Sequence, residues 1–214
     1  MQRLRIRFCR GGELRFISHL DLMRLWQRAL TRAGINLAYS EGYSPHPRLS
    51  IAAPLALGVT SRAELMDVFL EKWASPHFFT DAVNQQLPEG IRVLEAHQIP
   101  PILPSLQSRM SFAEYEVKLE TEQGREEISG AIADLLSREE LPWQHQRDTG
   151  PRKYDLRKLI DDIRLEALVE GVATLVMKLR CDSGGSGRPE QVAAALGFAH
   201  PPQSIARTNL ILTT

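Results

Sequence analysis

The sequence of 214 residues has very few cysteines and no complete catalytic motif. Its two cysteines, Cys9 and Cys181, are far apart in the chain and match no metal-binding or redox spacing, which is typical of free thiols in a reducing compartment. It has no CxxxCxxC motif for an iron–sulfur cluster, no HExxH, no GxSxG, no Walker loop and no GxGxxG fingerprint. We therefore expect no resident metal or cofactor, and the sequence favours a binding protein over an enzyme.

Long hydrophobic runs are also absent. The longest uncharged apolar stretch lies around residues 49–61, which is too short to span a bilayer and contains Pro54. The first twelve residues, MQRLRIRFCRGG, contain no apolar segment of the length found in a signal peptide. Together these observations predict a cytoplasmic protein without a membrane partner.

The chain has no net charge, but its charges are unevenly distributed. The 26 Lys and Arg residues balance the 26 Asp and Glu residues, so bulk composition neither favours nor excludes nucleic acid as a partner. Residues 1–62 nevertheless contain ten arginines, no lysine and only three acids, which is a local excess of seven positive charges. Such asymmetry predicts an anionic partner for the basic segment.

A proline-rich stretch, IPPILPS at residues 99–105, divides the chain into two halves of similar size. We expect a semi-rigid connector at 99–111 between one unit at 1–98 and another at 112–214. The first half predicts a strand at 3–9, a helix at 18–33, extended pieces at 36–40 and 48–53, a strand at 65–71, a helix from Ser75 and a strand at 91–96. The second half predicts strands at 112–120, 141–147, 172–181 and 204–212 and helices at 126–137 and 189–196. This order predicts an α+β fold of two tandem ferredoxin-like (βαββαβ) units with antiparallel sheets, and a single α+β domain with a larger mixed sheet is the alternative.

The helix expected at 18–33 carries the clearest candidate binding surface. Ser18 and Asp21 fit a capping box at its start. Arg24, Arg28 and Arg32 recur every four residues, so they line one exposed face, and their planar forks suit phosphate or carboxylate. A solvated helix face without a binding role is the alternative. The other arginines expected to add to this anion-binding surface are Arg3, Arg5, Arg7, Arg10, Arg15 and Arg48.

Two histidines accompany this helix, and each has a functional and a structural interpretation. His19 lies in the first helical turn, where the helix dipole disfavours a second positive charge, so it suits a ligand contact or proton carrier as well as a structural hydrogen bond. His46 is held between Pro45 and Pro47 in extended backbone, near Tyr43, whose ring suits stacking on a base. A rigid surface loop is the alternative for His46. If the chain is an enzyme, His19 and His46 are the candidate acid and base.

A glycine-rich turn at residues 181–190 joins a strand to a helix in the second half. The amides of Gly185 and Gly187, together with the start of the following helix, are expected to form an anion site that Arg188 reinforces. A flexible loop without a binding role is the alternative, because the turn matches no specific phosphate-binding fingerprint.

A second basic cluster occupies residues 147–158. It interleaves Arg152, Lys153 and Arg157 with a tyrosine, which is typical of a contact strip for a polyanion. A solvated loop explains the same composition. No further histidine of the chain is assigned a role from its sequence context.

Several of these motifs resemble the radical SAM-linked protein family, a bacterial family of unknown function. The resemblance is carried by LRFISHLDLMR at 14–24, YSEGYSPHP at 39–47 and PLALGV at 54–59, and less specifically by residues 155–157 and 185–189. The family usually has Gly-Phe-Asn-Pro-His-Pro where this chain has GYSPHP. The resemblance implies a separate radical SAM protein as partner, which would carry the radical chemistry because the cluster cysteines are missing here.

Three functions are left open by the sequence. The first is a non-catalytic module that binds RNA or another phosphorylated ligand through the arginine helix, the His46 loop and the glycine turn, and presents it to a radical SAM enzyme. The second is a protein–protein adaptor whose arginines meet an acidic partner surface. The third is an acid–base enzyme, such as a metal-independent ribonuclease, which requires His19 and His46 to converge.

Overall fold

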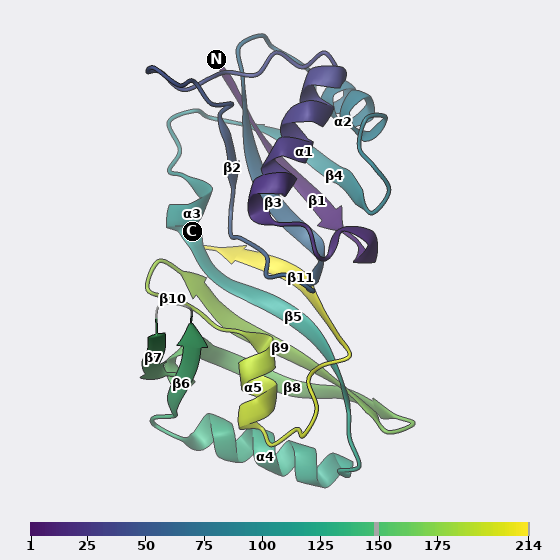
Figure 1. Ribbon diagram of the computed structural model, residues 1–214, viewed down its shortest axis with the longest axis vertical. Coiled ribbons are helices and arrows are strands. Elements are labelled where there is room, and N and C mark those ends of the chain that lie inside the picture. The colour runs from purple at the N-terminus through teal and green to yellow at the C-terminus, as the bar shows by residue number, and fades with distance from the viewer. Residues whose placement is uncertain (148–149, 214) are drawn as a thin grey trace. The chain divides into compact units, whose positions relative to one another are not determined.

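A computed structural model describes residues 1–147 and 150–213 of the chain (Figure 1). The chain divides into two compact units, of which unit 1 consists of Met1–Met110 and Leu212–Thr214 and unit 2 of Ser111–Ile211. Helices and mostly antiparallel strands are mixed in both, so the protein is α+β as predicted. In the part of the chain that the structure describes, no helix is long and apolar enough to cross a membrane.

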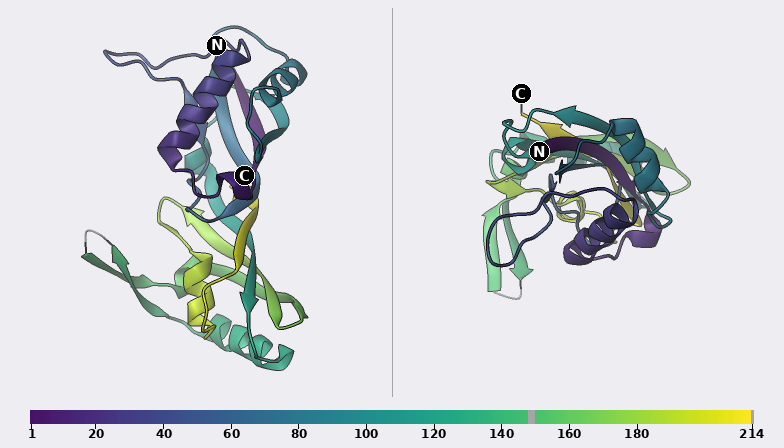
Figure 2. Two further views of the ribbon diagram at one scale, coloured as in Figure 1. Left: turned by 45° about the vertical axis from the view of Figure 1, so that its right-hand side comes forward. Right: turned by 90° about the horizontal axis from the view of Figure 1, so that it is seen from above.

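Unit 1 is built around a four-stranded antiparallel sheet with strand order β4-β1-β3-β2. Its elements in chain order are β1 (Gln2–Arg10), α1 (His19–Arg32), β2 (Leu49–Ile51), β3 (Thr60–Leu70), α2 (Pro76–Asn84), β4 (Ile91–Ile99) and the short helix α3 (Leu106–Arg109). The helices α1 and α2 share one hydrophobic core with β1 and β3, so both pack on the same face of the sheet. Figures 1 and 2 show α1 lying along this sheet.

Alternating side chains of β1 determine the two faces of the unit 1 sheet. Leu4, Ile6 and Phe8 point towards the helices and are fully buried. Phe8 meets Trp26 of α1 edge to face, with 4.9 Å between the ring centroids. Because one face of α1 is committed to this core, its opposite face remains for solvent or a ligand.

The start of α1 is fixed by the predicted cap. The Ser18 hydroxyl oxygen accepts a hydrogen bond from the Asp21 amide at 3.1 Å, and the hydroxyl donates to the Asp21 carboxylate at 2.7 Å. At the other end, Gly34 has a positive φ of 71°, which glycine adopts without strain. The helix therefore has defined ends, and these ends fix which of its residues lie on the exposed face.

The arginines of β1 do not join an exposed binding surface, contrary to the prediction. Arg3 is buried and its Nη2 contacts the Asp67 carboxylate at 2.5 Å, while the Arg5 Nε donates to the same carboxylate at 2.9 Å. Arg7 lies 3.6 Å from a glutamate of β4. Arg10 is buried and donates to main-chain carbonyls in the loop before β3. Strand pairing brings acids and carbonyls to these side chains, so Arg3, Arg5 and Arg10 support the fold, whereas Arg7 forms only an exposed pair.

The sheet strands of unit 2 have the order β11-β5-β9-β8, and the short strand β10 also pairs with β9. Its elements in chain order are β5 (Met110–Glu120), α4 (Arg125–Ser137), β6 (Pro142–Arg147), β7 (Gly150–Asp155), β8 (Ile160–Val169), β9 (Val172–Asp182), β10 (Gly185–Ser186), α5 (Pro189–Ala195) and β11 (Ser204–Leu212). The helix α4 packs against β8.

The strand expected at 141–147 is not part of the main sheet of unit 2. It is β6, which pairs with β7 in a separate hairpin that projects from the body of the unit (Figure 2). The place beside β9 is taken by β8, which was not predicted. Two irregularities in its pairing, at 160–162 and 165–167, break the alternation of apolar residues by which a half-buried strand is recognised.

Candidate functional site

One candidate site is a groove along the exposed face of α1, here called the arginine groove. Arg24, Arg28 and Arg32 line it, together with Leu87 and Pro88 from the segment after α2. The groove has a volume of about 470 Å³. Consecutive arginines are four residues apart, so each is displaced by about 6 Å along the helix axis from the next. The structure thus brings the three predicted arginines together on one surface.

All three guanidinium groups of the arginine groove keep N–H donors for a ligand. Arg24 donates to the Asp21 carboxylate at 3.0 Å, and Arg32 donates to the Gln86 carbonyl at 2.8 Å. Hydrogen bonds from Ser18 and Arg24 lower the pKa of Asp21, so this carboxyl stays ionised. Among the described residues, Arg28 has no carboxylate within ion-pair distance. Because an arginine carries five N–H donors, one internal partner leaves most of them available.

His19 and His46 lie at opposite ends of unit 1. Arg15, four residues before His19, accepts a hydrogen bond through its carbonyl from the segment that precedes β3. The carbonyl of Arg48, two residues after His46, instead accepts an amide near the end of β3. β3 has eleven residues and so extends for about 35 Å. Direct proton transfer within one site requires hydrogen-bond distances, so the proposed acid–base pair is wrong.

The other predicted contacts of unit 1 are separate from the arginine groove. Tyr43 and His46 are exposed in a loop that projects from the unit (Figure 2). The guanidinium carbon of Arg15 lies 4.8 Å from the centre of the Phe16 ring, and that of Arg48 lies 4.4 Å from a phenylalanine ring of β3. Stacked in this way, these arginines are held by their own unit rather than gathered with those of α1.

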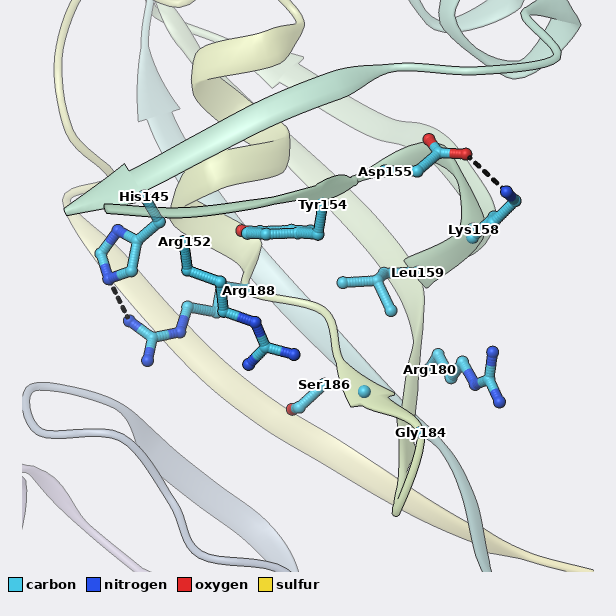
Figure 3. Close-up of a pocket in the computed structure, with 11 residues that line it drawn as sticks. His145, Arg152, Tyr154, Asp155, Lys158, Leu159, Arg180, Gly184, Ser186 and Arg188 are labelled. Carbon is cyan, nitrogen blue, oxygen red and sulfur yellow. Dashed lines mark hydrogen bonds and ion pairs between the residues drawn. The ribbon is translucent and has the colours of Figure 1, made fainter. Parts of the chain in front are cut away.

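The second candidate site is a pocket of about 320 Å³ in unit 2, here called the basic pocket (Figure 3). Its cations come from four different places in the fold: Arg152 from β7, Lys158 from the turn after β7, Arg180 from β9 and Arg188 from the residue before α5. His145, Tyr154 and Asp155 also line it, together with residues of the glycine turn. Four positive groups thus surround one cavity of ligand size.

Two of these cations are each paired with an acid of unit 2. Lys158 lies 3.3 Å from the Asp155 carboxylate, and a hydrogen bond from the Leu141 amide together with Lys158 lowers the pKa of Asp155. The Arg180 Nε donates to Asp182 at 2.6 Å. Burial raises the pKa of Asp182, but Arg180 and two amides of the glycine turn lower it further, so the net shift is downward. Both acids are therefore ionised and hold their cations in place.

Arg152 and Arg188 are less neutralised. The Nη1 atom of Arg188 lies 3.4 Å from Nε2 of His145 and 3.9 Å from the Glu190 carboxylate. The guanidinium carbon of Arg152 lies 5.8 Å from the centre of the Tyr154 ring, and within the described residues no carboxylate lies within 4 Å of it. Two guanidinium groups therefore face the same pocket with most of their donors unused (Figure 3).

The glycine-rich turn does not form the predicted anion cradle. The Gly185 amide donates to the Asp182 carboxylate at 3.1 Å, and the Gly187 amide donates to a carbonyl of β9 at 2.8 Å. A Cβ atom at Gly187 would lie 2.9 Å from the Leu159 carbonyl oxygen, so this position needs glycine for close packing. Gly185 forms part of the wall of the basic pocket, and the amides of both glycines are used within the chain.

Two predicted residues of the second basic cluster lie outside the basic pocket. Lys153 alternates with Arg152 and Tyr154 along β7, so its side chain lies on the opposite face of the hairpin. Arg157 donates to main-chain carbonyls of α4 and β8, at 2.9 and 2.7 Å, and therefore supports the fold. Residues 148–149 of the cluster lie outside the described residues.

Two polar residues of the basic pocket, Arg180 and His145, lie outside both of the segments that the sequence singled out in this half of the chain. Arg180 lies between the buried Leu179 and Cys181 of β9. Because side chains of a strand alternate between its two faces, the sequence alone indicates that Arg180 points away from the core, next to the glycine turn. His145 stands alone in the sequence, and only the pairing of β6 with β7, which sets it opposite Arg152, brings it to the pocket. The first signal was present in the sequence, whereas the second depends on tertiary structure.

Comparison with known proteins gives a family and a fold. A family model described as "Uncharacterized protein conserved in bacteria (DUF2344)" matches residues 3–189, and no curated protein matches the chain. Similar solved structures include a Cbf5-Nop10-Gar1 complex, with a TM-score of 0.55, and the archaeal box H/ACA sRNP Nop10-Cbf5 complex, with a TM-score of 0.49, each at 10% identity. Each match covers 98% of this chain, which spans 48% and 47% of the matched chains, about half their length. At this identity the likeness concerns the fold alone.

Proposed function

This chain belongs to the DUF2344 family of uncharacterized proteins conserved in bacteria, and we propose that it is a non-catalytic module that binds RNA through its arginine groove. The observation that carries the proposal is that Arg24, Arg28 and Arg32 line one groove and keep free N–H donors there. Arginine forks match phosphate oxygens in a bidentate way, which makes an ordered row of them a surface for a phosphate backbone.

The geometry of the row suits a single strand running along α1. Three guanidinium groups about 6 Å apart along the helix axis offer one cation to each of several successive phosphates. Contacts with three phosphates of single-stranded RNA predict that the logarithm of the association constant falls with the logarithm of salt concentration with a slope of about −2. This slope is the measurable signature of the proposal.

The strand orders support a finer proposal about the fold. Unit 1 has the order β4-β1-β3-β2, and unit 2 has β11-β5-β9-β8, with one helix after the first strand and one after the third strand of each sheet. In both, the fourth strand lies beside the first and the second lies at the other edge. This is the ferredoxin-like arrangement, so we propose two such units in tandem, with the β6–β7 hairpin inserted in the second.

The resemblance to the radical SAM-linked family supports the last part of the proposal. A chain that carries those motifs at 14–24 and 39–47 and lacks cluster cysteines suits the role of a separate substrate-binding partner. In this proposal the module works in the cytoplasm and presents the bound RNA to a radical SAM protein. The family resemblance is the reason to propose a radical SAM partner, and the arginine groove is the reason to propose RNA as the ligand.

The test is a titration of a short, fluorescently labelled single-stranded RNA with the full chain at several salt concentrations. Arg24→Ala/Arg28→Ala removes two of the three proposed phosphate contacts, so its salt slope should be less negative by about 1.4 and its affinity at low salt lower. The matched control is Arg92→Ala/Arg125→Ala, which removes the same charge from exposed positions outside the groove. The control should keep the slope of the wild type.

Two outcomes would overturn the proposal. If the Arg24→Ala/Arg28→Ala variant keeps the affinity and the salt slope of the wild type, the arginine groove does not bind RNA. If the wild type binds no RNA but captures an acidic protein partner through Arg24 and Arg28, the adaptor function is correct instead. Circular dichroism of each variant establishes that the helix α1 is still folded.

A further inference from the structure

We propose that the basic pocket of unit 2 binds a terminal phosphate monoester, either of a free nucleoside monophosphate or at the phosphorylated end of an RNA. The pocket has a volume of about 320 Å³, in the range of small-molecule sites, and its walls are largely polar. It belongs to a different unit from the arginine groove, so the inference holds whether or not that groove binds RNA.

The balance of charge in the basic pocket favours an anion. Asp155 and Asp182 offset Lys158 and Arg180, respectively, but Arg152 and Arg188 have no comparable partner. The one carboxylate near Arg188 is 3.9 Å away and partly exposed, where an ion pair contributes little. Two guanidinium groups that face one cavity repel each other unless an anion lies between them. A phosphate monoester carries a charge of about −1.5 to −2 at neutral pH, which matches this pair.

The arrangement of the cations distinguishes a terminal phosphate from a phosphate within a chain. The cations of the basic pocket come from β7, the turn after it, β9 and the start of α5, so they approach one point from several sides. A monoester offers three acceptor oxygens in a compact group, whereas a phosphodiester has two free oxygens and must leave the site in two directions. The arginine groove, with its cations in a row, is the contrasting case.

Tyr154 gives the pocket a place for a base or sugar next to the phosphate. Its hydroxyl donates to the Gln191 side chain of α5, which fixes the orientation of the ring. Figure 3 shows this ring edge-on above the side chains of Arg152 and Arg188. A fixed aromatic ring beside an anion site suits stacking of a nucleobase, which tolerates any base because every base has a π-face.

The wall opposite Tyr154 is already organised without a ligand. The Asp182 carboxylate accepts the amides of Gly184 and Gly185 at 2.7 and 3.1 Å, and it also holds Arg180. A Cβ atom at Gly185 would lie 2.7 Å from the Cδ2 atom of Leu159, so this leucine side chain packs closely against the turn. A site whose wall is held in this way loses little conformational entropy when a ligand binds.

The experiment is isothermal titration of the full chain with AMP, adenosine and inorganic phosphate, and with short RNAs that differ only in a 5′-phosphate or 5′-hydroxyl. AMP should bind, adenosine should bind at least tenfold more weakly, and inorganic phosphate should compete with AMP. Preference for AMP assigns a free nucleotide, and preference for the phosphorylated RNA assigns an RNA end.

Matched variants identify the residues responsible. Arg152→Gln/Arg188→Gln should weaken AMP binding by at least tenfold, whereas Lys153→Gln, which removes the same charge from the opposite face of β7, should change it less than twofold. Tyr154→Leu should weaken AMP binding and leave inorganic phosphate binding unchanged. If the double variant fails to fold, the single variants Arg152→Gln and Arg188→Gln carry the test.

The proposal is overturned if the wild type binds none of the phosphate probes, if adenosine binds as tightly as AMP, or if Lys153→Gln weakens binding as much as the pocket variants do. The Arg24→Ala/Arg28→Ala variant should retain the AMP affinity of the wild type. Failure of RNA binding at the arginine groove is therefore distinguishable from failure of phosphate binding in unit 2.

Discussion

The replacement Asp67→Asn tests whether the arginines of β1 belong to the fold rather than to a ligand site. Asp67 accepts Arg3 Nη2 at 2.5 Å and Arg5 Nε at 2.9 Å. The side chains of Asp67 and Arg3 are only 1% and 3% exposed, so water screens their interaction weakly. One carboxylate therefore compensates two guanidinium groups, one of them inside unit 1.

The expected loss of stability follows from this burial. Removing one partner of a buried ion pair leaves an uncompensated charge and costs about 3–5 kcal/mol. Arg3 also donates to main-chain carbonyls of Leu103 and Pro104, and Arg5 retains some access to water, so the lower end of that range applies. A loss of about 3 kcal/mol corresponds to a decrease of about 12 °C in the unfolding temperature of a domain with about 100 residues.

Urea and thermal unfolding followed by circular dichroism measure this loss. The matched control is Glu95→Gln, which removes a carboxylate 3.6 Å from Arg7 in a pair whose side chains are 41% and 52% exposed. Such an exposed pair contributes about 0–1 kcal/mol, so the control should unfold close to the wild type. If Asp67→Asn unfolds like Glu95→Gln, the buried pair does not stabilise the fold, and if the variant steepens the salt slope of RNA binding, the β1 arginines take part in binding.

Two further predictions concern unit 2. Gly187→Ala should destabilise unit 2 by about 1–3 kcal/mol because the new Cβ would lie 2.9 Å from the Leu159 carbonyl oxygen. Gly130→Ala, which places a Cβ in open space on α4, should instead stabilise unit 2 by up to about 1 kcal/mol. If thermal unfolding shows changes of the same sign for both variants, the packing argument is refuted. The lowered folded-state pKa of Asp155, caused first by the Leu141 amide, contributes stability above the unfolded pKa of about 4 that is lost as the pH falls through the folded value. Urea unfolding between pH 5 and 2 should therefore show a smaller decrease for Asp155→Asn than for the wild type, and equal decreases would contradict this assignment.

Much of unit 1 could be predicted because its signals are local. The alternation along β1 and the cap at Ser18 each depend on residues within a few positions of one another, and the structure has β1 and α1 within one residue of the expected bounds. The arginine groove could be predicted for the same reason, since helical spacing alone places Arg24, Arg28 and Arg32 on one face. Local periodicity therefore predicts both an element and the surface it exposes.

The basic pocket depends on interactions that no local pattern contains. His145 and Arg152 meet because β6 pairs with β7, and Arg180 and Arg188 meet them because the glycine turn folds back between β9 and α5. The prediction that this turn itself binds an anion was wrong because Asp182, near its start, already accepts two of its amides. A glycine-rich sequence has the same composition whether its amides face a ligand or a neighbouring carboxylate.

The fold also changes how the uneven distribution of charge along the sequence is interpreted. The segment 1–62 has seven excess positive charges, but Arg3 and Arg5 of β1 pair with Asp67, which lies beyond this segment. Along α1, by contrast, no strand partner reaches the arginines, and their charge stays available to a ligand. The basic pocket, conversely, lies in the acidic remainder of the chain, because four cations from separated positions converge there. Net charge along a sequence therefore identifies a binding surface only after each strand charge has been matched with its cross-strand partner.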